Sequence, residues 1–298
     1  MNKTVIVLIT LMLVSIGFLS GCNENRNVGT QIFIVDLQPT EDTLCRLLNN
    51  LYVNQKDFDA QFKWTTVMNQ VVMNSTIDSM DKNRSNIIVD IDGLDSAEKV
   101  YYEDKLNANL EELTSQQKTQ ANRIKEMIDY YNTKENNLLE YVDMLDLYID
   151  FVNYTRIKMT LLEDNQNTFN LMISYVDNAE YEKAIRKGLE LLQIYHDLKD
   201  NEFARANLNM LNYSEEILSV WDLYIEGMQY YIKYLNLTLD GRYSQAEIQH
   251  NLYEDRFNQA KEIEGSKNPT ATNEEIDSWY NNNIGVYTNM FVDYYQCL

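Results

Sequence analysis

Two side chains near the C-terminal end of the sequence have a spacing that metal-binding helices use. Glu247 and His250 are three residues apart, which places both side chains on one face of a helix. A di-iron helical bundle needs two such Glu-x-x-His pairs and two further Glu residues. The other His of the chain, His196, has Gln193 three residues before it. We therefore expect Glu247 and His250 to be an isolated pair and predict no metal site.

A second pattern, between residues 81 and 92, has the spacing of a calcium-binding loop. Asp81, Asn83, Ser85 and Asp92 place oxygen ligands at positions 1, 3, 5 and 12 of such a loop. However, Asn86 stands where the loop needs Gly for a sharp turn, and Asp92 replaces the usual bidentate Glu. A polar connection between two helices has the same composition. We expect such a connection here, with a calcium site as the alternative.

The sequence offers no other constellation of catalytic type. It contains no Gly-rich phosphate-binding loop, no Gly-x-Ser-x-Gly motif and no Cys–His pair of catalytic type. Asp and Glu are so abundant that the choice of two as an acid–base pair would be arbitrary. We therefore expect a protein that is not an enzyme and that holds no cofactor.

The composition limits both the fold class and the kind of partner. The 298 residues include 25 Lys or Arg and 46 Asp or Glu, which gives a formal net charge of −21. Such a surface repels the phosphate backbone, so we expect no nucleic-acid partner. Hydrophobic residues make up 45%, as in folded proteins. With nine Gly and two Pro, the chain lacks the turn residues of β-sandwiches and barrels.

The hydrophobic pattern is helical over most of the chain. The 94 residues between Gly93 and Gly188 contain no Gly and no Pro. Within them, apolar and Tyr residues recur at alternating steps of three and four, which is typical of long helices that pack along a seam. Polar stretches at 117–120, 132–137 and 164–168 predict interruptions. Asp95, with Glu98 three residues later, predicts a helix start, because the pair resembles a capping box.

Two short segments, 179–184 and 241–246, share a Tyr-x-x-Ala core, at Tyr181 and Ala184 and again 62 residues later. Each resembles the turn and second helix of tetratricopeptide-type repeats, although the regular 34-residue period is absent. We therefore predict an all-α protein. Its long antiparallel helical bundle spans residues 41–177, and helical hairpins follow over 178–298.

Aromatic residues are concentrated in the last third of the chain. Five of them are candidates for a groove that binds a peptide or a glycan: Trp221, Tyr224, Tyr231, Trp279 and Tyr280. Packing in the core is the default alternative, because a Tyr ring can be buried while its hydroxyl reaches the edge of the core.

The N-terminus has the residue pattern of a targeting signal. Lys3 precedes an apolar run over residues 5–18, which is shorter than the about 20 residues that span a bilayer and fits a secretory signal peptide. The following Leu19-Ser20-Gly21-Cys22 resembles the lipobox of prokaryotic lipoproteins. The resemblance implies removal of residues 1–21 and a diacylglyceryl group on Cys22, with residues 22–40 as a tether. An uncleaved anchor is the alternative.

The remaining cysteines, Cys45 and Cys297, form an even pair in a compartment that permits disulfides. We expect them to be bridged, and two separate thiols are the alternative.

Taken together, these features predict an extracytoplasmic protein that a lipidated Cys22 anchors to the cell membrane. We expect a non-enzymatic envelope scaffold that binds another protein. The alternative is an ectodomain that binds or senses a small molecule.

Overall fold

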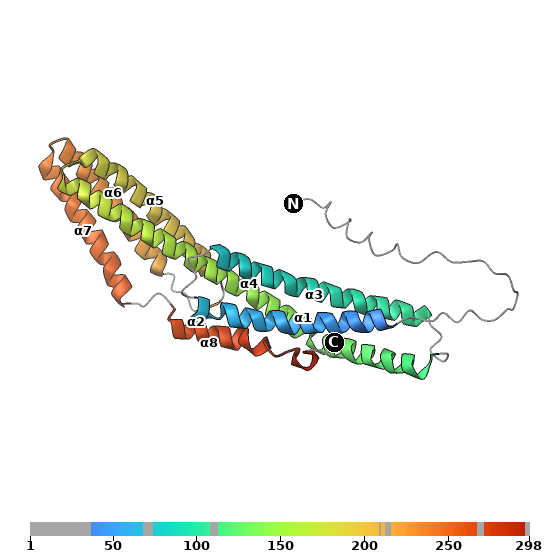
Figure 1. Ribbon diagram of the computed structural model, residues 1–298. Coiled ribbons are helices and arrows are strands. Elements are labelled where there is room, and N and C mark those ends of the chain that lie inside the picture. Colours follow the sequence, from blue (N-terminus) through green and yellow to red (C-terminus); the bar gives the residue numbers. More distant parts are fainter. Residues whose placement is uncertain are drawn as a thin grey trace, which may run out of the picture. The chain divides into compact units, whose positions relative to one another are not determined.

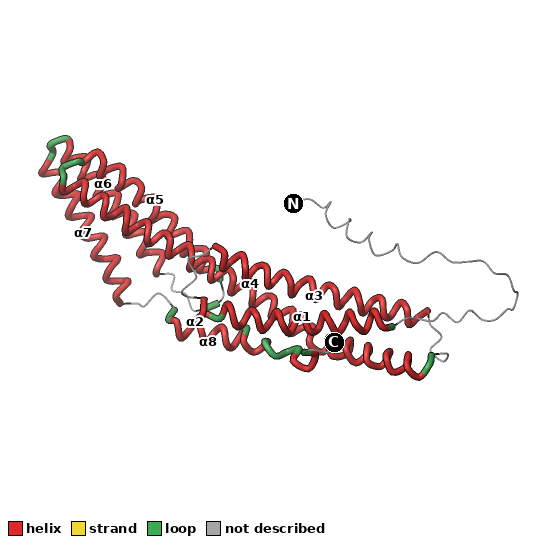
Figure 2. Tube along the Cα trace, in the orientation of Figure 1, coloured by secondary structure: helices red, strands yellow, loops and turns green. Residues whose placement is uncertain are grey.

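A computed structural model describes residues 37–67, 74–107, 113–208, 210–211, 216–266 and 271–295. Every regular element in these residues is helical, so the expected all-α fold is confirmed (Figures 1 and 2). The elements are α1 (Gln38–Phe62), α2 (Trp64–Val67), α3 (Asn74–Asn107), α4 (Ser115–Asp177), α5 (Tyr181–Ala206), α6 (Glu216–Leu239), α7 (Tyr243–Ser266), α8 (Asn273–Asn283) and the short 3₁₀ helices η2 (Gly285–Tyr287) and η3 (Val292–Tyr294). None of the described helices is long and apolar enough to span a membrane.

Helix α4 is continuous over 63 residues, or about 95 Å at 1.5 Å per residue. It begins at a capping box in which Thr114 and Gln117 bond each other's backbone N–H. The interruptions expected at 117–120, 132–137 and 164–168 are therefore wrong, because all three stretches lie within this one helix. Residues 132–137 lie mostly in solvent between buried Tyr131 and Leu138, so they form the polar outer face of the helix rather than a break.

Helix α3 likewise runs through both of its predicted breaks. The segment 81–92 is helical and is no calcium loop, and Asp95 lies inside the helix rather than at its start. Buried Ile87 and Leu94, seven residues apart, continue one apolar stripe through this region. The Asp95 carboxylate instead accepts a hydrogen bond of 2.7 Å from the Tyr131 hydroxyl, which ties α3 to α4.

The first half of α4 packs with α1 and α3 into a bundle. Two contacts show the relative direction of α4 and α1. Near the start of both helices, Glu41 of α1 lies beside Arg123 of α4. Farther along both, the Phe62 carbonyl oxygen at the end of α1 accepts a hydrogen bond of 2.8 Å from the Tyr148 hydroxyl of α4. These two helices are therefore parallel, which differs from the expected antiparallel order, and α3 runs opposite to both. The core between them consists of Leu and aromatic side chains, with Leu44, Leu48, Leu51, Phe58, Leu138, Tyr141, Leu145 and Tyr148 all fully buried.

The second half of α4 begins a row of helical hairpins. Helix α5 packs on α4, α6 packs on α5, and α7 packs on α6, so neighbours in sequence are neighbours in space (Figure 1). Gly188 on α5 and Gly227 on α6 permit close approach of the neighbouring helices. A Cβ atom at Gly188 would lie less than 3.0 Å from Ile232 on α6, and one at Gly227 would lie less than 3.0 Å from Phe257 on α7.

The C-terminal elements leave this row and return to the first bundle. Helix α8 packs on α2 and α4, and η3 packs on α1. The Trp64 indole donates a hydrogen bond of 3.0 Å to Asn273, and Tyr280 is fully buried with its ring 5.1 Å from that of Tyr148. Residues 273–294 therefore pack with the helices of the expected 41–177 bundle rather than with the hairpins.

The hairpin of α4 with α5 and the hairpin of α6 with α7 close with the same kind of turn. In each, the residue two positions before the Tyr-x-x-Ala core has left-handed backbone geometry, with φ of 56° at Ala179 and 72° at Gly241. The N–H of Glu180 donates to the Tyr175 carbonyl oxygen and that of Arg242 to the Leu237 carbonyl oxygen, each at 2.8 Å. This is the Schellman pattern of helix ends.

The matched turns give a stability prediction of opposite sign at equivalent positions. Ala179→Gly relieves left-handed strain and is expected to stabilise the protein by about 0.5–1 kcal/mol, after the larger chain entropy of Gly is subtracted. Gly241→Ala introduces the same strain where no atom lies within 4 Å of the new Cβ, so it is expected to destabilise by about 1 kcal/mol. Urea denaturation measures both, and shifts of the same sign would contradict this account.

Candidate functional site

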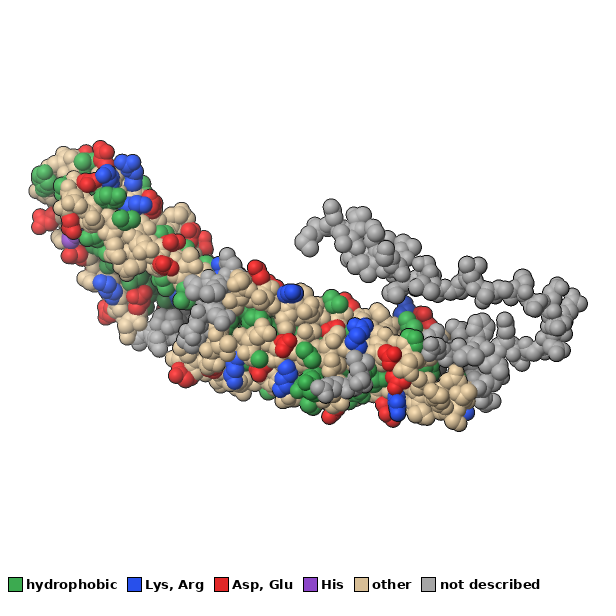
Figure 3. All heavy atoms as spheres, in the orientation of Figure 1, with side chains coloured by type: hydrophobic (Ala, Val, Ile, Leu, Met, Phe, Trp, Pro, Cys, Tyr) green, Lys and Arg blue, Asp and Glu red, His purple; other side chains and the backbone are tan. Residues whose placement is uncertain are grey.

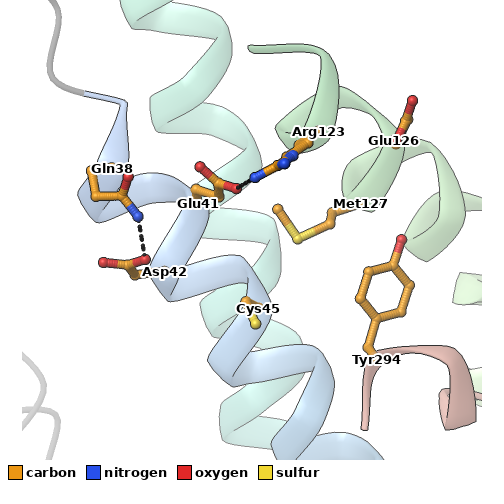
Figure 4. A pocket seen from close by; sticks show the side chains of 8 residues that line it. All are labelled: Gln38, Glu41, Asp42, Cys45, Arg123, Glu126, Met127 and Tyr294. Atoms are coloured by element: carbon orange, nitrogen blue, oxygen red, sulfur yellow. Dashed lines mark hydrogen bonds and ion pairs between the residues drawn. The ribbon is translucent and has the colours of Figure 1, made fainter. Parts of the chain in front are cut away.

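A pocket of about 470 Å³ opens where the first turns of α1, the first turns of α4 and η3 meet (Figure 4). This volume lies in the range of small-molecule sites. Four of its lining residues come from α1, three from α4 and one from η3: Gln38, Glu41, Asp42 and Cys45; Arg123, Glu126 and Met127; and Tyr294.

Helical periodicity places the α1 residues on one side of the pocket. Gln38, Glu41, Asp42 and Cys45 are three or four residues apart and therefore share a face of α1. The Gln38 amide donates to Asp42 at 2.7 Å, which holds that carboxylate beside the pocket. A proline follows Gln38 in the first turn of α1, where its fixed φ favours helix initiation.

Contacts between the parallel helices form the opposite wall. The Arg123 guanidinium lies 3.5 Å from the Glu41 carboxylate, and the Gln120 amide donates to Gln38 at 2.6 Å. Arg123 is largely exposed, so this ion pair contributes little to stability. Its main effect is to orient Glu41 along the pocket edge, as Figure 4 shows.

Tyr294 reaches the pocket from the C-terminal segment, which Tyr130 of α4 holds in place. The Tyr130 ring contacts that of Tyr294 at 4.9 Å, and its hydroxyl donates to the Met290 carbonyl oxygen at 2.7 Å. Burial, together with the nearby carboxylate of Asp293, raises the pKa of Tyr130 to about 12. The hydroxyl therefore stays protonated and remains a hydrogen-bond donor at neutral pH.

The pocket combines an acidic rim with an apolar part. Three carboxylates, those of Glu41, Asp42 and Glu126, oppose one guanidinium, while Cys45 and Met127 are buried and supply sulfur and methylene surface. Such a lining suits a small molecule that carries a cationic group on an apolar body. Among the described residues, no group of three or more His, Cys, Asp or Glu side chains is placed to hold a metal ion.

Cys45 is the only residue of the expected disulfide that lies within the described part of the chain, and Cys297 lies outside it. Tyr294 shares the pocket with Cys45, and the Tyr295 ring packs 5.1 Å from that of Tyr52 in α1. These contacts bring the segment just before Cys297 beside the α1 face that contains Cys45. The bridge stays a prediction, with this placement in its favour. Cys22 also lies outside the described residues.

The aromatic candidates from α6 pack into the hairpin core. Trp221 and Tyr231 are buried, and Tyr224 is half-buried with its hydroxyl 2.8 Å from Glu264. The Trp221 ring contacts that of Tyr195 on α5, the Tyr224 ring that of Phe257 on α7, and the Tyr231 ring that of Tyr253 on α7. Core packing, the default alternative, accounts for these three side chains.

The other two aromatic candidates lie in a separate cluster on α8. Trp279 is half-buried and stacks on Tyr148 at 6.3 Å, and Tyr280 is fully buried. The five candidates are thus divided between two clusters of ring contacts, and the structure does not bring them together as one groove. The concentration of aromatic residues in the sequence reflects two separate sets of packed rings here.

Glu247 and His250 both lie on α7. His250 contacts the rings of Tyr231, Tyr234 and Tyr253, with centroid separations between 5.0 and 6.4 Å. Its nearest carboxylate contact is with Glu254 at 3.7 Å. The histidine is therefore part of an aromatic cluster between α6 and α7.

No family model, curated protein or solved structure matches this chain. Apart from Cys45, which was expected to pair with Cys297, the pocket residues were not among the candidates from the sequence. The one feature of the sequence that pointed to this site was the acidic residue Glu41 in the first turn of an expected helix. The α4 residues that lie across the pocket from it are more than 80 positions later in the sequence, so their proximity could not be read from the sequence.

Proposed function

We propose that this chain is a lipid-anchored extracytoplasmic protein, attached through Cys22, whose helical hairpins bind another protein without catalysing a reaction. The row from α4 to α7 carries the proposal. Stacked helical hairpins offer extended surfaces that suit protein partners. The identical turns at Ala179 and Gly241 support a repeated unit of this kind.

Exposed apolar side chains on the hairpins support a protein partner. Leu189 on α5 and Ile248 on α7 are 53% and 58% exposed, and Tyr243 at the start of α7 is 70% exposed. On the face shown in Figure 3, acidic and basic side chains are interspersed over the helices, so this face has no block of one charge. An interface of mixed polar and apolar character fits such a surface.

The anchor is tested by Cys22→Ser in the full chain. We expect the variant to lose the lipid mass and to move from the membrane to the soluble fraction, because a diacyl anchor supplies most of the membrane affinity. Intact-mass measurement and cell fractionation provide the readout. Cys297→Ser is the control and should remain lipidated. A membrane-bound Cys22→Ser protein would instead indicate an uncleaved anchor.

The binding surface is tested by placing a photo-crosslinking amino acid at Leu189, at Ile248 or at Val89. Val89 on α3 is 66% exposed and serves as the matched control outside the hairpins. In intact cells we expect a crosslinked protein of defined mass from Leu189 or Ile248 and none from Val89. Crosslinking that is equal at all three positions, or confined to Val89, would contradict a hairpin interface.

A second candidate function, capture of a small molecule, is favoured by the pocket between α1, α4 and η3. We infer that a cationic amphiphile is the class of ligand that its acidic rim and apolar interior suit. In this second candidate function the pocket is the ligand site of a sensing or carrier ectodomain. This candidate rests on the lining residues alone and is independent of the hairpin surface.

Charge reversal in the pocket tests this second candidate. Native mass spectrometry of the purified protein is expected to show an adduct that Asp42→Arg or Glu126→Arg removes, because either substitution repels a cation. Asp57→Arg makes the same change at an exposed position of α1 outside the pocket and should retain the adduct. A protein that is free of adducts, or an adduct that survives both reversals, argues against a cationic ligand here.

A further inference from the structure

A layer of polar side chains crosses the core of the first bundle. Gln55 on α1 is fully buried, yet neither its amide nitrogen nor its amide oxygen has a hydrogen-bond partner among the described residues. The hydroxyls of Tyr141 on α4 and Tyr280 on α8 are likewise buried without a hydrogen-bond partner in the described part of the chain. Buried polar groups in folded proteins are nearly always paired with protein or with ordered water.

The three side chains lie at one level of the bundle. Residues of α1 lie beside residues of α4 that are 82 to 86 positions later in the sequence, as the contacts of Glu41 with Arg123 and of Phe62 with Tyr148 show. Gln55, between these two contacts, therefore lies beside residues 137–141 of α4. Tyr280 lies beside this part of α4, because its ring is 5.1 Å from that of Tyr148 and Tyr141 is among the groups that raise its pKa.

Asp59 adds a carboxylate to this level. It lies one helical turn after Gln55 and is half-buried. Burial first, and then the charge of Asp59, raise the pKa of both Tyr141 and Tyr280, and for Tyr280 the nearby Asp59 carboxylate also contributes as a hydrogen-bond acceptor. Asp59 and the Tyr280 hydroxyl are thus neighbours, but no hydrogen bond of proper geometry joins them among the described residues. Both hydroxyls are therefore protonated at neutral pH and available as donors, while the Asp59 carboxylate only accepts.

The donors and acceptors of this layer define what it binds. An anion would be repelled by Asp59, and an apolar molecule would leave the amide and the hydroxyls unpaired. Water donates two hydrogen bonds and accepts two, so it can pair with the Gln55 amide and with tyrosine hydroxyls at the same time. We propose that Gln55, Tyr141 and Tyr280 bind at least one ordered internal water, which links α1, α4 and α8.

Oxygen-17 magnetic relaxation dispersion tests the site, because it counts water molecules that stay bound longer than the protein takes to tumble. The probe is water itself. The proteins compared are the full chain in its wild-type form and the variants Gln55→Leu and Tyr141→Phe. We expect each variant to lose at least one long-lived water. An unchanged count in both variants would overturn the proposal.

The sign of the stability change provides a second readout that does not depend on detecting the water. A hydroxyl that bonds an internal water contributes to stability, so Tyr141→Phe and Tyr280→Phe are expected to lower the denaturation midpoint. A hydroxyl buried dry and unpaired is unfavourable, and its removal would raise the midpoint. A raised midpoint in both variants would therefore also overturn the proposal.

Tyr148→Phe is the matched control, since its hydroxyl donates directly to the Phe62 carbonyl oxygen in the same bundle. It should lower the midpoint and leave the number of long-lived waters unchanged. Loss of a long-lived water in this control as well would mean that the count follows loosening of the bundle rather than the Gln55 layer, and would count against the proposal.

Discussion

The packing of the first half of α4 against α1 positions nearly everything else in the structure. Leu138, Tyr141, Leu145 and Tyr148 fill the space between these two helices, and the bond from Tyr148 to the backbone at Phe62 fixes how far one has advanced along the other. The same register places Arg123 beside Glu41 and so builds the pocket. Because α4 continues without a break, it also provides the first helix of the hairpin row.

Tyrosine is the characteristic core residue of this protein. Its ring gives a large apolar surface, while its hydroxyl reaches a partner on another element, as with Tyr131 and Asp95, Tyr130 and Met290, or Tyr224 and Glu264. The bonds of Tyr131 and Tyr224 join two helices that packing alone would allow to slide, and that of Tyr130 joins α4 to the turn before η3. The long helices of this fold pack through continuous apolar faces, along which uniform Leu packing would permit sliding. These directional hydrogen bonds restrict that sliding.

Much of the fold could be predicted from the sequence, because helical periodicity is a local property. Of the apolar and Tyr residues that recur at steps of three and four, Tyr131, Leu138, Tyr141, Leu145, Tyr148 and Val152 are buried, whereas Met159 and Leu162, farther along the same repeat, are exposed. Both hairpin turns lie just before the Tyr-x-x-Ala cores, where the resemblance to tetratricopeptide-type repeats predicts them. The false breaks in α3 and α4 have one cause. A run of polar residues on an exposed helix face has the composition of a loop, and only the neighbouring helices decide between the two.

The candidate site was beyond reach of the same reasoning. Its walls come from α1, α4 and η3, and the meeting of Glu41 with Arg123 depends on how two distant helices pack. Burial of the aromatic residues has the same origin. Nothing near Trp221 or Tyr280 in the sequence indicates whether a second helix covers the ring, so composition alone could not separate a core from a groove.

The return of α8 to the first bundle has a consequence for how the chain folds. The bond between Trp64 and Asn273 joins residues 209 positions apart, whereas the hairpins from α4 to α7 consist of contacts between neighbours in sequence. Local contacts form early, and contacts that close long loops form late, because the entropy of loop closure must be lost before they stabilise anything. The hairpins are thus expected to assemble first. Docking of α8 and the C-terminal segment, which brings Tyr294 to its pocket, then becomes the closing step of folding.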